Sequence, residues 1–246
     1  MKAIIFGGTT GMGRAIARLL VERGDSVFLL AMSEDELTRS AADLKERHPA
    51  RADVSYALCD LERPEGFAAA LDAADAALGG FDTVIVTAAM FASQEALETD
   101  VELLRRLVTV NYAHTVVFCE HARKRLLARG GGRLAVFSSV AGDRGRKPVV
   151  IYGSSKAGLS AYLEGLDHKF HAAGLHVLCV KPGFVKTGMT AGLKPPPFAG
   201  EPEQVARDVV RALDHKKPVL YTPGPWALVM FVIRLLPRFV MRKIGF

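Results

Sequence analysis

The sequence predicts an α/β fold in which one doubly wound parallel sheet forms a single domain. Short, wholly apolar runs alternate along the chain with longer segments of helical periodicity, and a glycine-rich turn follows the first run. Strands that are apolar on both faces are typical of a parallel sheet covered by helices on both sides. The 246 residues, half of them hydrophobic, are enough for one large core.

Seven apolar runs are the expected strands, and six helical segments fill the gaps between them. The strands are expected at residues 3–6, 27–30, 54–58, 83–86, 134–137, 177–180 and 219–221, and the helices at 12–23, 34–47, 65–78, 100–128, 154–173 and 203–215. Glycines stand where most of these helices should end. The Pro- and Gly-rich stretch 188–201 is interpreted as a mobile substrate lid inside a domain that covers residues 1–224.

Composition and charge exclude several classes of protein. Cys59, Cys119 and Cys179 match neither a metal spacing nor a disulfide framework, so we expect no metal and a reducing compartment. The N-terminal apolar run is too short for a signal peptide, and a cytoplasmic location is expected. Residues 217–246 contain five Lys/Arg and no Asp/Glu, which leaves the first 216 residues with a net charge of only +1. This balance argues against a nucleic-acid partner.

The turn after the first strand carries three glycines with the spacing GxxxGxG, at Gly7, Gly11 and Gly13. Without a Cβ, these residues allow a tight turn and let backbone N–H groups approach a pyrophosphate at the helix N-terminus. Such a turn is typical of the Rossmann fold, which binds dinucleotides. Taken alone, the motif is also compatible with an ordinary strand–helix turn.

A second group of polar residues has the spacing of a reaction centre. Tyr152 and Lys156 are four residues apart and share one face of a helix. Ser139 follows the strand at 134–137, and open α/β sheets carry their active groups at the carboxyl ends of parallel strands. Asn111 lies in an apolar stretch of a long helix, where asparagine is disfavoured. A buried structural asparagine is the alternative to a functional one.

Together these motifs resemble the short-chain dehydrogenase/reductase family, in family order and spacing from residue 3 to about 190. The residues that carry the resemblance are Gly7, Gly11, Gly13, Asp60, Asn111, Ser139, Tyr152, Lys156 and the loop 182–187. The resemblance implies an NAD(P)-dependent oxidoreductase that reduces a ketone to a secondary alcohol. It also implies a homodimer or homotetramer packed through the helices at 100–128 and 154–173.

The resemblance implies a role for each residue of the reaction centre. Tyr152 would be the general acid, with a pKa lowered from about 10 toward neutrality by Lys156 and the oxidised nicotinamide. Lys156 would also hold the nicotinamide ribose. Ser139, preferred to its neighbour Ser138, would hydrogen-bond the substrate oxygen. Asn111 would distort its helix and place a water in a proton relay to Lys156.

The same resemblance implies a cofactor site. Its expected residues are Gly7, Thr9, Thr10, Gly11, Met12, Gly13, Met32, Ser33, Asp60, Leu61, Thr87, Tyr152, Lys156, Val185 and Thr187. Asp60 would accept from the adenine amine, while Val185 and Thr187 would hold the nicotinamide end. An acidic residue after the second strand would select NAD, but the chain has Met32 and Ser33 there. With no carboxylate at this position and Arg14 nearby, we favour NADP(H), with NAD(H) as the alternative.

The segment 225–246 differs from the rest of the chain. An apolar run is followed by Arg234, Arg238 and Arg242 at intervals of four, and Pro237 should kink the segment. This basic amphipathic pattern is too short and too charged to span a bilayer. Two interpretations remain. The segment either contacts the inner face of a membrane beside the mouth of the active site, or covers the core or a neighbouring subunit.

Residues 141–147, 185–193 and 219–246 are more closely similar to the decaprenylphosphoryl-2-keto-pentose reductase branch of the family, which reduces a keto-sugar carried on a polyprenyl phosphate. This similarity implies a lipid-linked or amphipathic ketone as substrate. Arg144, Arg146 and Lys147 either bind a substrate phosphate or belong to a solvated basic loop. The alternative enzyme is a 3-ketoacyl or 3-ketosphinganine reductase. The alternative of a different class is a non-catalytic dinucleotide sensor.

Overall fold

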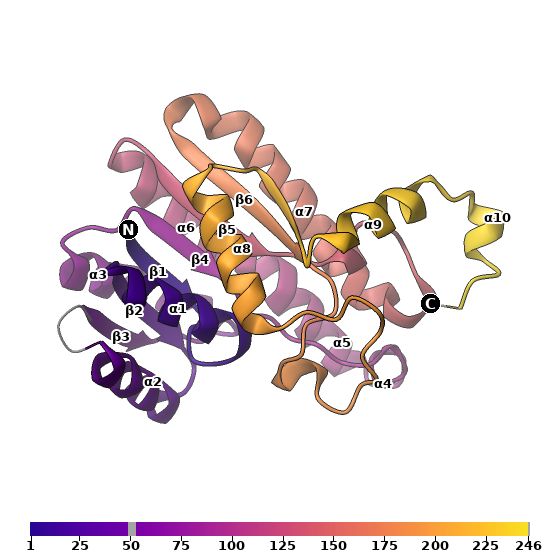
Figure 1. Ribbon diagram of the computed structural model, residues 1–246, viewed down its shortest axis with the longest axis horizontal. Helices are drawn as coiled ribbons and strands as arrows, with labels where there is room; N and C mark the ends of the chain where they lie inside the picture. Colours follow the sequence, from indigo (N-terminus) through magenta and orange to yellow (C-terminus); the bar gives the residue numbers. More distant parts are fainter. Residues whose placement is uncertain (49–52, 246) are drawn as a thin grey trace.

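A computed structural model of the chain describes residues 1–48 and 53–245, which contain one seven-stranded parallel sheet (Figure 1). The strands are β1 Lys2–Phe6, β2 Ser26–Ala31, β3 Val54–Leu58, β4 Thr83–Val86, β5 Gly132–Phe137, β6 Leu175–Pro182 and β7 Val219–Thr222. Their order across the sheet is β3-β2-β1-β4-β5-β6-β7. The chain winds outward from β1 to β3, returns to β4 beside β1, and winds outward again. This topology confirms the predicted doubly wound sheet.

Helices cover both faces of this sheet (Figure 1). They are α1 Gly11–Arg23, α2 Glu34–Arg47, α3 Phe67–Leu78, α4 Gln94–Thr99, α5 Val101–Val108, α6 Thr115–Ala128, α7 Val150–Phe170, α8 Pro202–Asp214, α9 Pro225–Leu235 and α10 Arg238–Met241. Side chains alternate along a strand, so Ile4 and Phe6 of β1 pack with α3, α6 and α7, and Ala3 and Ile5 pack with α1, α2 and α8. The two hydrophobic cores lie on opposite faces of one sheet.

Two predicted helices have different boundaries in the structure. The helix expected at 100–128 is divided, because a π-helical turn at Thr109–His114 separates α5 from α6. The turn surrounds Asn111, whose buried amide bonds to another segment, and one-turn π-helices are frequent at functional positions. The helix expected to start at 154 starts at Val150, after a short turn that contains Pro148. Proline is favoured near a helix N-terminus. Because α7 starts at Val150, Tyr152 lies in its first turn.

The carboxyl ends of the central strands meet at one edge of the sheet. Phe6 pairs with Val86, and Val86 pairs with Val136. The segments that follow β1, β4 and β5 therefore lie side by side, and the segment after β6 is next to them. In open α/β sheets this edge is where ligands bind.

The segment from residue 225 onward forms α9 and α10, which lie beyond the main body of the fold at the right of Figure 1. Met230 and Ile233 of α9 are buried against Val140, which follows β5. Pro237 separates the two helices, as expected. Phe246, the last residue of the predicted amphipathic segment, lies outside the described residues. Within residues 1–48 and 53–245, no helix is both long enough and apolar enough to cross a membrane.

Removal of the Phe118 ring should destabilise the fold. This side chain has no exposed surface, and its ring centroid lies 4.8 Å from that of Phe6 and 5.3 Å from that of Phe67. Phe118→Ala leaves a cavity in the core and should lower the free energy of unfolding by about 3–5 kcal/mol, measured by chemical denaturation. Val101→Ala truncates an exposed side chain and should change the free energy of unfolding by less than about 0.5 kcal/mol. Equal effects of the two substitutions would contradict this packing.

Candidate active site

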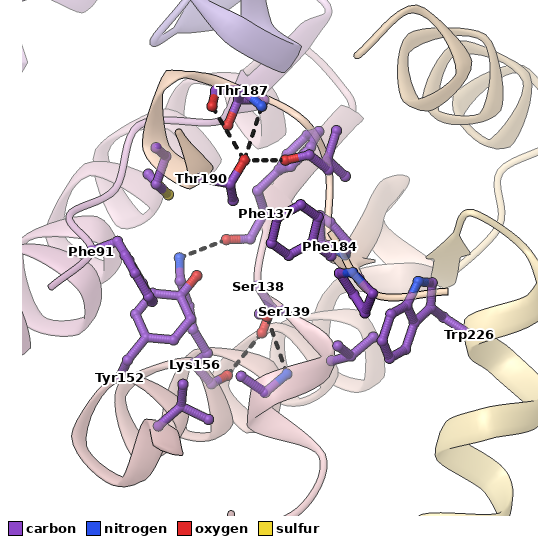
Figure 2. A pocket seen from close by; sticks show the side chains of 18 of the residues that line it. Phe91, Phe137, Ser138, Ser139, Tyr152, Lys156, Phe184, Thr187, Thr190 and Trp226 are labelled. Carbon is purple, nitrogen blue, oxygen red and sulfur yellow. Dashed lines mark hydrogen bonds between the residues drawn. The ribbon is translucent and has the colours of Figure 1, made fainter. Parts of the chain in front are cut away.

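A cavity of about 590 Å³ lies at the carboxyl edge of the sheet (Figure 2). Most of its wall is apolar, with large side chains from Phe91, Phe184, Leu193, Phe198, Trp226 and Ile233. Figure 2 shows Phe91 and Tyr152 on one side of the space and Trp226 on the other. Among the described lining residues, Arg146 and Lys156 are the charged ones. Three of the predicted catalytic residues, Ser139, Tyr152 and Lys156, line this cavity together.

Tyr152 and Lys156 lie in the first two turns of α7. The Lys156 Nζ donates to the carbonyl of Phe137 at 2.9 Å and lies 5.8 Å from the centroid of the Tyr152 ring. Because Lys156 is only 2% exposed, burial lowers the pKa of its ammonium group to about 8. Burial raises the pKa of Tyr152 to about 12, although a hydrogen bond with Ser139 acts in the opposite direction. The side chains around Tyr152 therefore do not by themselves produce the predicted lowering of its pKa.

The two serines after β5 have different partners. The Ser138 hydroxyl donates to the carbonyl of Lys156 at 2.9 Å and lies 2.7 Å from the hydroxyl of Ser160, so it joins β5 to α7. The Ser139 hydroxyl accepts a hydrogen bond from the backbone N–H of Ala141 at 3.1 Å. The side chains of Ser139 and Tyr152 are also hydrogen-bonded to each other. This arrangement supports the choice of Ser139, rather than Ser138, as the residue beside the reacting oxygen.

Asn111 is fully buried in the π-helical turn, outside the described lining of the cavity. Its Oδ1 accepts from the N–H of Met90 at 2.7 Å, and its Nδ2 donates to the carbonyl of Met90 at 2.8 Å. The amide therefore fixes the segment after β4. This segment carries Phe91, whose ring lies edge-on to that of Tyr152 with 5.2 Å between the ring centroids. The side chain of Asn111 thus has a structural role. Its part in a proton relay stays a prediction.

The glycine-rich turn has the shape that a dinucleotide requires. Gly7 and Gly11 have φ angles of +90° and +50°, which favour glycine. A Cβ on Gly13 would lie 2.1 Å from the carbonyl oxygen of Gly7, so only glycine allows α1 to begin so close to β1. Thr10, at the N-terminus of α1, makes no side-chain cap bond, and Met12 lines the cavity. These features fit a pyrophosphate at the start of α1.

A second cavity of about 300 Å³ adjoins this turn on the side of α2. Its lining residues are Thr9, Thr10, Arg14, Glu36, Arg39 and Ser40. The Thr9 hydroxyl donates to the Glu36 carboxylate at 2.9 Å, and Ser33 caps α2 by accepting from the Glu36 N–H at 3.3 Å. Met32 and Ser33 carry no carboxylate, but the carboxylate of Glu36 lines the adjoining cavity, which sequence reasoning did not foresee. The missed signal is the S-x-x-E spacing of Ser33 and Glu36, which places Glu36 in the first turn of α2.

The remaining predicted cofactor residues lie around the same edge. Asp60 caps the turn after β3 by accepting from the N–H of Glu62 at 2.9 Å, and the carbonyl of the buried Leu61 is 2.9 Å from the Nδ1 of His114. The Thr87 hydroxyl donates to the carbonyl of Gly7 at 3.1 Å, which joins the turns after β1 and β4. Met32 is 76% exposed at the end of β2.

The segment after β6 brings Val185 and Thr187 to the cavity wall. A Cβ on Gly11 would lie 3.4 Å from the methyl group of Thr187, so this segment faces the N-terminus of α1. The hydroxyl of Thr190 donates to the carbonyl of Val185 at 2.7 Å and accepts from the N–H of Thr187 at 3.0 Å (Figure 2). Sequence reasoning did not single out Thr190, whose pairing closes this turn.

The basic residues between Ser139 and Tyr152 do not act as one group. The Arg144 guanidinium donates to the carbonyl of Leu236 at 2.7 Å, and the Lys147 ammonium donates to the carbonyl of Arg242 at 2.7 Å. These carbonyls stand at the C-terminal ends of α9 and α10, where a cation is favourable. Two of the three proposed phosphate ligands therefore hold the C-terminal helices. Only Arg146 lines the described cavity.

Asp143 anchors the same loop to the sheet. Its carboxylate accepts from the Lys181 ammonium at 2.6 Å and from the Tyr221 hydroxyl at 2.7 Å. Its side chain is almost fully buried. The loop 143–147 is thus fixed to β6 and β7 on one side and to α9 and α10 on the other.

The chain is similar in sequence to several known proteins. Residues 1–197 match the family model described as short chain dehydrogenase. An uncharacterized oxidoreductase of Mycobacterium tuberculosis is 36% identical over 98% of this chain and 95% of its own length. Carbonyl reductase family member 4 of Xenopus tropicalis is 28% identical over 85% of this chain and 89% of its own length.

Solved structures show the same fold. A short-chain type dehydrogenase/reductase from Mycobacterium ulcerans superposes with a TM-score of 0.83 at 22% identity, over 98% of this chain and 97% of its own. A variant of actinorhodin polyketide ketoreductase, solved with NADPH, gives a TM-score of 0.80 at 24% identity, over 90% of this chain and 95% of its own.

A methyl group at Gly13 should disrupt cofactor binding. Gly13→Ala would place a Cβ against the Gly7 carbonyl and displace the start of α1. Overpacking of this kind costs about 1–3 kcal/mol, so we expect NADPH affinity, measured by fluorescence titration, to fall about tenfold or more. Gly66→Ala, at a position with no neighbouring atom within 4 Å, is the matched control and should bind NADPH normally. Circular dichroism would verify that both variants fold. Unchanged affinity in a folded Gly13→Ala variant would contradict this site.

Proposed function

Because the chain belongs to the short-chain dehydrogenase/reductase family, we propose that it reduces a ketone to a secondary alcohol with NADPH in the large apolar cavity. The observation that carries the proposal is the convergence of Ser139, Tyr152 and Lys156 on this cavity, beside a turn shaped for a dinucleotide. A non-catalytic dinucleotide sensor would have no need of this set, so it is the weaker alternative.

Each residue of the set would have one task. Bound NADPH would supply the hydride that goes to the carbonyl carbon. Ser139 would hold the carbonyl oxygen by a hydrogen bond, and Tyr152 would give its proton to that oxygen as the negative charge develops. Lys156 would stabilise the phenolate that remains and hold the ribose of the cofactor. The raised pKa of Tyr152 keeps its proton in place until the alkoxide forms, which suits the direction of reduction.

The wall of the cavity indicates the substrate class. Aromatic and aliphatic side chains dominate it, so a small polar ketone would leave most of this surface without a partner. We propose an amphipathic or lipid-linked ketone, such as a keto-sugar on a polyprenyl phosphate, with 3-ketoacyl and 3-ketosphinganine compounds as the alternatives. The likeness to a polyketide ketoreductase supports ketone reduction in general. A panel of these three ketone classes, assayed by oxidation of NADPH and NADH, would identify the class.

We propose NADP(H) as the cofactor. Arg14 and Arg39 bring two guanidinium groups to the cavity beside α2, where Glu36 also lies. Arg14 is paired with Asp43 at 3.1 Å and Arg39 has no carboxylate partner among the ion pairs of the described residues. The Glu36 carboxylate accepts a hydrogen bond from Thr9, which ties it to the turn after β1. NAD(H) is the alternative, because Glu36 would also suit a ribose hydroxyl.

The remaining proposals concern location and assembly. We propose that the enzyme acts in the cytoplasm at the inner face of a membrane, and that it is a homodimer or homotetramer packed through α5, α6 and α7. Tyr112 and Val117 are exposed apolar side chains on the proposed subunit interface. The division at residue 224 is likewise a proposal, supported by the change of composition and charge after it.

Tyr152→Phe should abolish most of the activity. The substitution removes the proton donor and leaves the ring, so turnover should fall by about 10²–10⁴-fold while NADPH still binds. Turnover is measured with the best ketone of the panel, and binding by fluorescence titration. Tyr112→Phe, on an exposed tyrosine of the π-helical turn, is the matched control and should keep wild-type turnover. More than about a tenth of wild-type turnover in Tyr152→Phe would refute the role of Tyr152.

Two substitutions should move cofactor preference in opposite directions. Met32→Asp adds a carboxylate after β2 and should lower the ratio of kcat/KM for NADPH to that for NADH. Glu36→Gln removes the carboxylate in the adjoining cavity and should raise the ratio. Glu34→Gln removes an exposed charge from the same helical turn and should leave the ratio unchanged. A ratio that responds to neither of the first two variants would show that this cavity does not hold the ribose.

A further inference from the structure

Helix α9 is apolar on two faces. Trp226, Val229 and Ile233 line the cavity from its inner face. On the outer face of the C-terminal helices, five large apolar side chains are between 51% and 70% exposed: Leu228, Phe231, Val232, Leu235 and Phe239. A surface helix of a globular protein normally has one apolar face, turned to the core. This second row of apolar side chains therefore requires a separate explanation.

The helix also joins the two loops that border the cavity. The indole N–H of Trp226 donates to the carbonyl of Phe198 at 3.1 Å, which connects the start of α9 to the segment after β6. The indole packs so closely on Gly183 that a Cβ there would lie 2.2 Å from its nitrogen. At the other end of α9, Arg144 donates to the carbonyl of Leu236. Helix α9 is therefore held at the border of the cavity, with its exposed apolar face on the side opposite the lining residues.

Exposed cations accompany the apolar row. Arg234, Arg238, Arg242 and Lys243 are all exposed, and residues 217–246 contain no Asp or Glu. Apolar side chains flanked by Lys and Arg are typical of a segment that lies in the boundary of an anionic membrane. A second copy of the chain fits this surface poorly. In a twofold contact, the same cations would face one another without an acidic partner from this segment.

We propose that the outer face of α9 and α10 docks on an anionic lipid surface and thereby places the rim of the cavity at the lipid boundary. The docking surface is defined by Leu228, Phe231, Val232, Leu235 and Phe239, with Arg234, Arg238, Arg242 and Lys243 beside them. An amphipathic ketone then enters the cavity along α9 without its apolar chain crossing water. This second step rests on the proposed function, while the docking itself does not.

The first experiment measures docking alone. The purified full-length protein is sedimented with vesicles of phosphatidylcholine, with or without phosphatidylglycerol. We expect binding to the anionic vesicles that weakens with salt. Each Lys or Arg near an anionic surface contributes about fivefold in affinity, so replacement of Arg234, Arg238 and Arg242 with Gln should weaken binding about a hundredfold. Phe231→Ser with Leu235→Ser should also release the protein, because apolar burial is lost.

Control variants separate this surface from general charge and hydrophobicity. Arg63, Arg207 and Arg211 are exposed and lie outside the two cavities and the proposed subunit interface, so their replacement with Gln removes the same charge from the body of the protein. Val101→Ser removes an exposed apolar side chain from α5. Both controls should bind vesicles like the wild type. The proposal would be overturned if the wild type did not bind anionic vesicles. It would also be overturned if the control variants lost as much vesicle affinity as the variants of α9 and α10. If the wild type binds no vesicles and forms a dimer that these same substitutions in α9 and α10 dissociate, the surface is a subunit contact and the proposal is also overturned.

The second experiment tests the placement of the cavity. Turnover of a long-chain 3-keto ester dissolved in the vesicles is compared with that of its short-chain, water-soluble homologue. Docking should lower the KM of the long-chain ester only. The variant with Gln at positions 234, 238 and 242 should show no such lowering of KM, and it should reduce the short-chain ester at the wild-type rate. Vesicle binding without any change in KM would overturn the placement of the rim. Failure to reduce any ketone would overturn the proposed function and leave the docking result intact.

Discussion

Two hydrogen bonds between the end of β5 and the second turn of α7 hold the reaction centre together. The Lys156 ammonium donates to the carbonyl of Phe137, and the Ser138 hydroxyl donates to the carbonyl of Lys156. A Cβ on Gly142 would lie 2.7 Å from the carbonyl carbon of Lys156, so the turn after β5 packs directly on the helix. This close packing sets the distance from Ser139 to α7 and leaves little freedom for the side chains that meet in the cavity.

Burial has opposite effects on the pKa values of the two ionisable groups in this unit. It favours the neutral phenol of Tyr152 and also the neutral amine of Lys156, because each charged form loses its hydration. Neutral tyrosine is the form that can donate a proton to an alkoxide. The reverse reaction needs the phenolate, which a nearby positive charge must stabilise. Within the proposed function, Lys156 would supply this positive charge.

Local patterns in the sequence were enough to predict the seven strands and the doubly wound sheet. The family resemblance added roles for Ser139, Tyr152 and Lys156, which line the cavity together. The helix α2 has the predicted bounds because its capping serine and its amphipathic pattern are both local signals. The partners of Arg144 and Lys147 could not be predicted, since they lie 92 and 95 residues away in the sequence. The pairing of Asn111 with Met90 is a tertiary contact of the same kind. The carboxylate of Glu36 was missed although its capping spacing was visible.

Part of the cavity wall comes from the chain beyond the segment that the family model covers. The family model covers residues 1–197, whereas Trp226, Val229 and Ile233 come from α9. Membership of the family therefore supports the chemistry proposed for Ser139 and Tyr152 but does not determine the substrate. The loop 143–147 connects the two parts, because it follows Ser139 directly and caps both C-terminal helices. In the proposed docking, the lipid surface would therefore contact the same helix that forms part of the cavity wall, and this would couple docking to substrate selection.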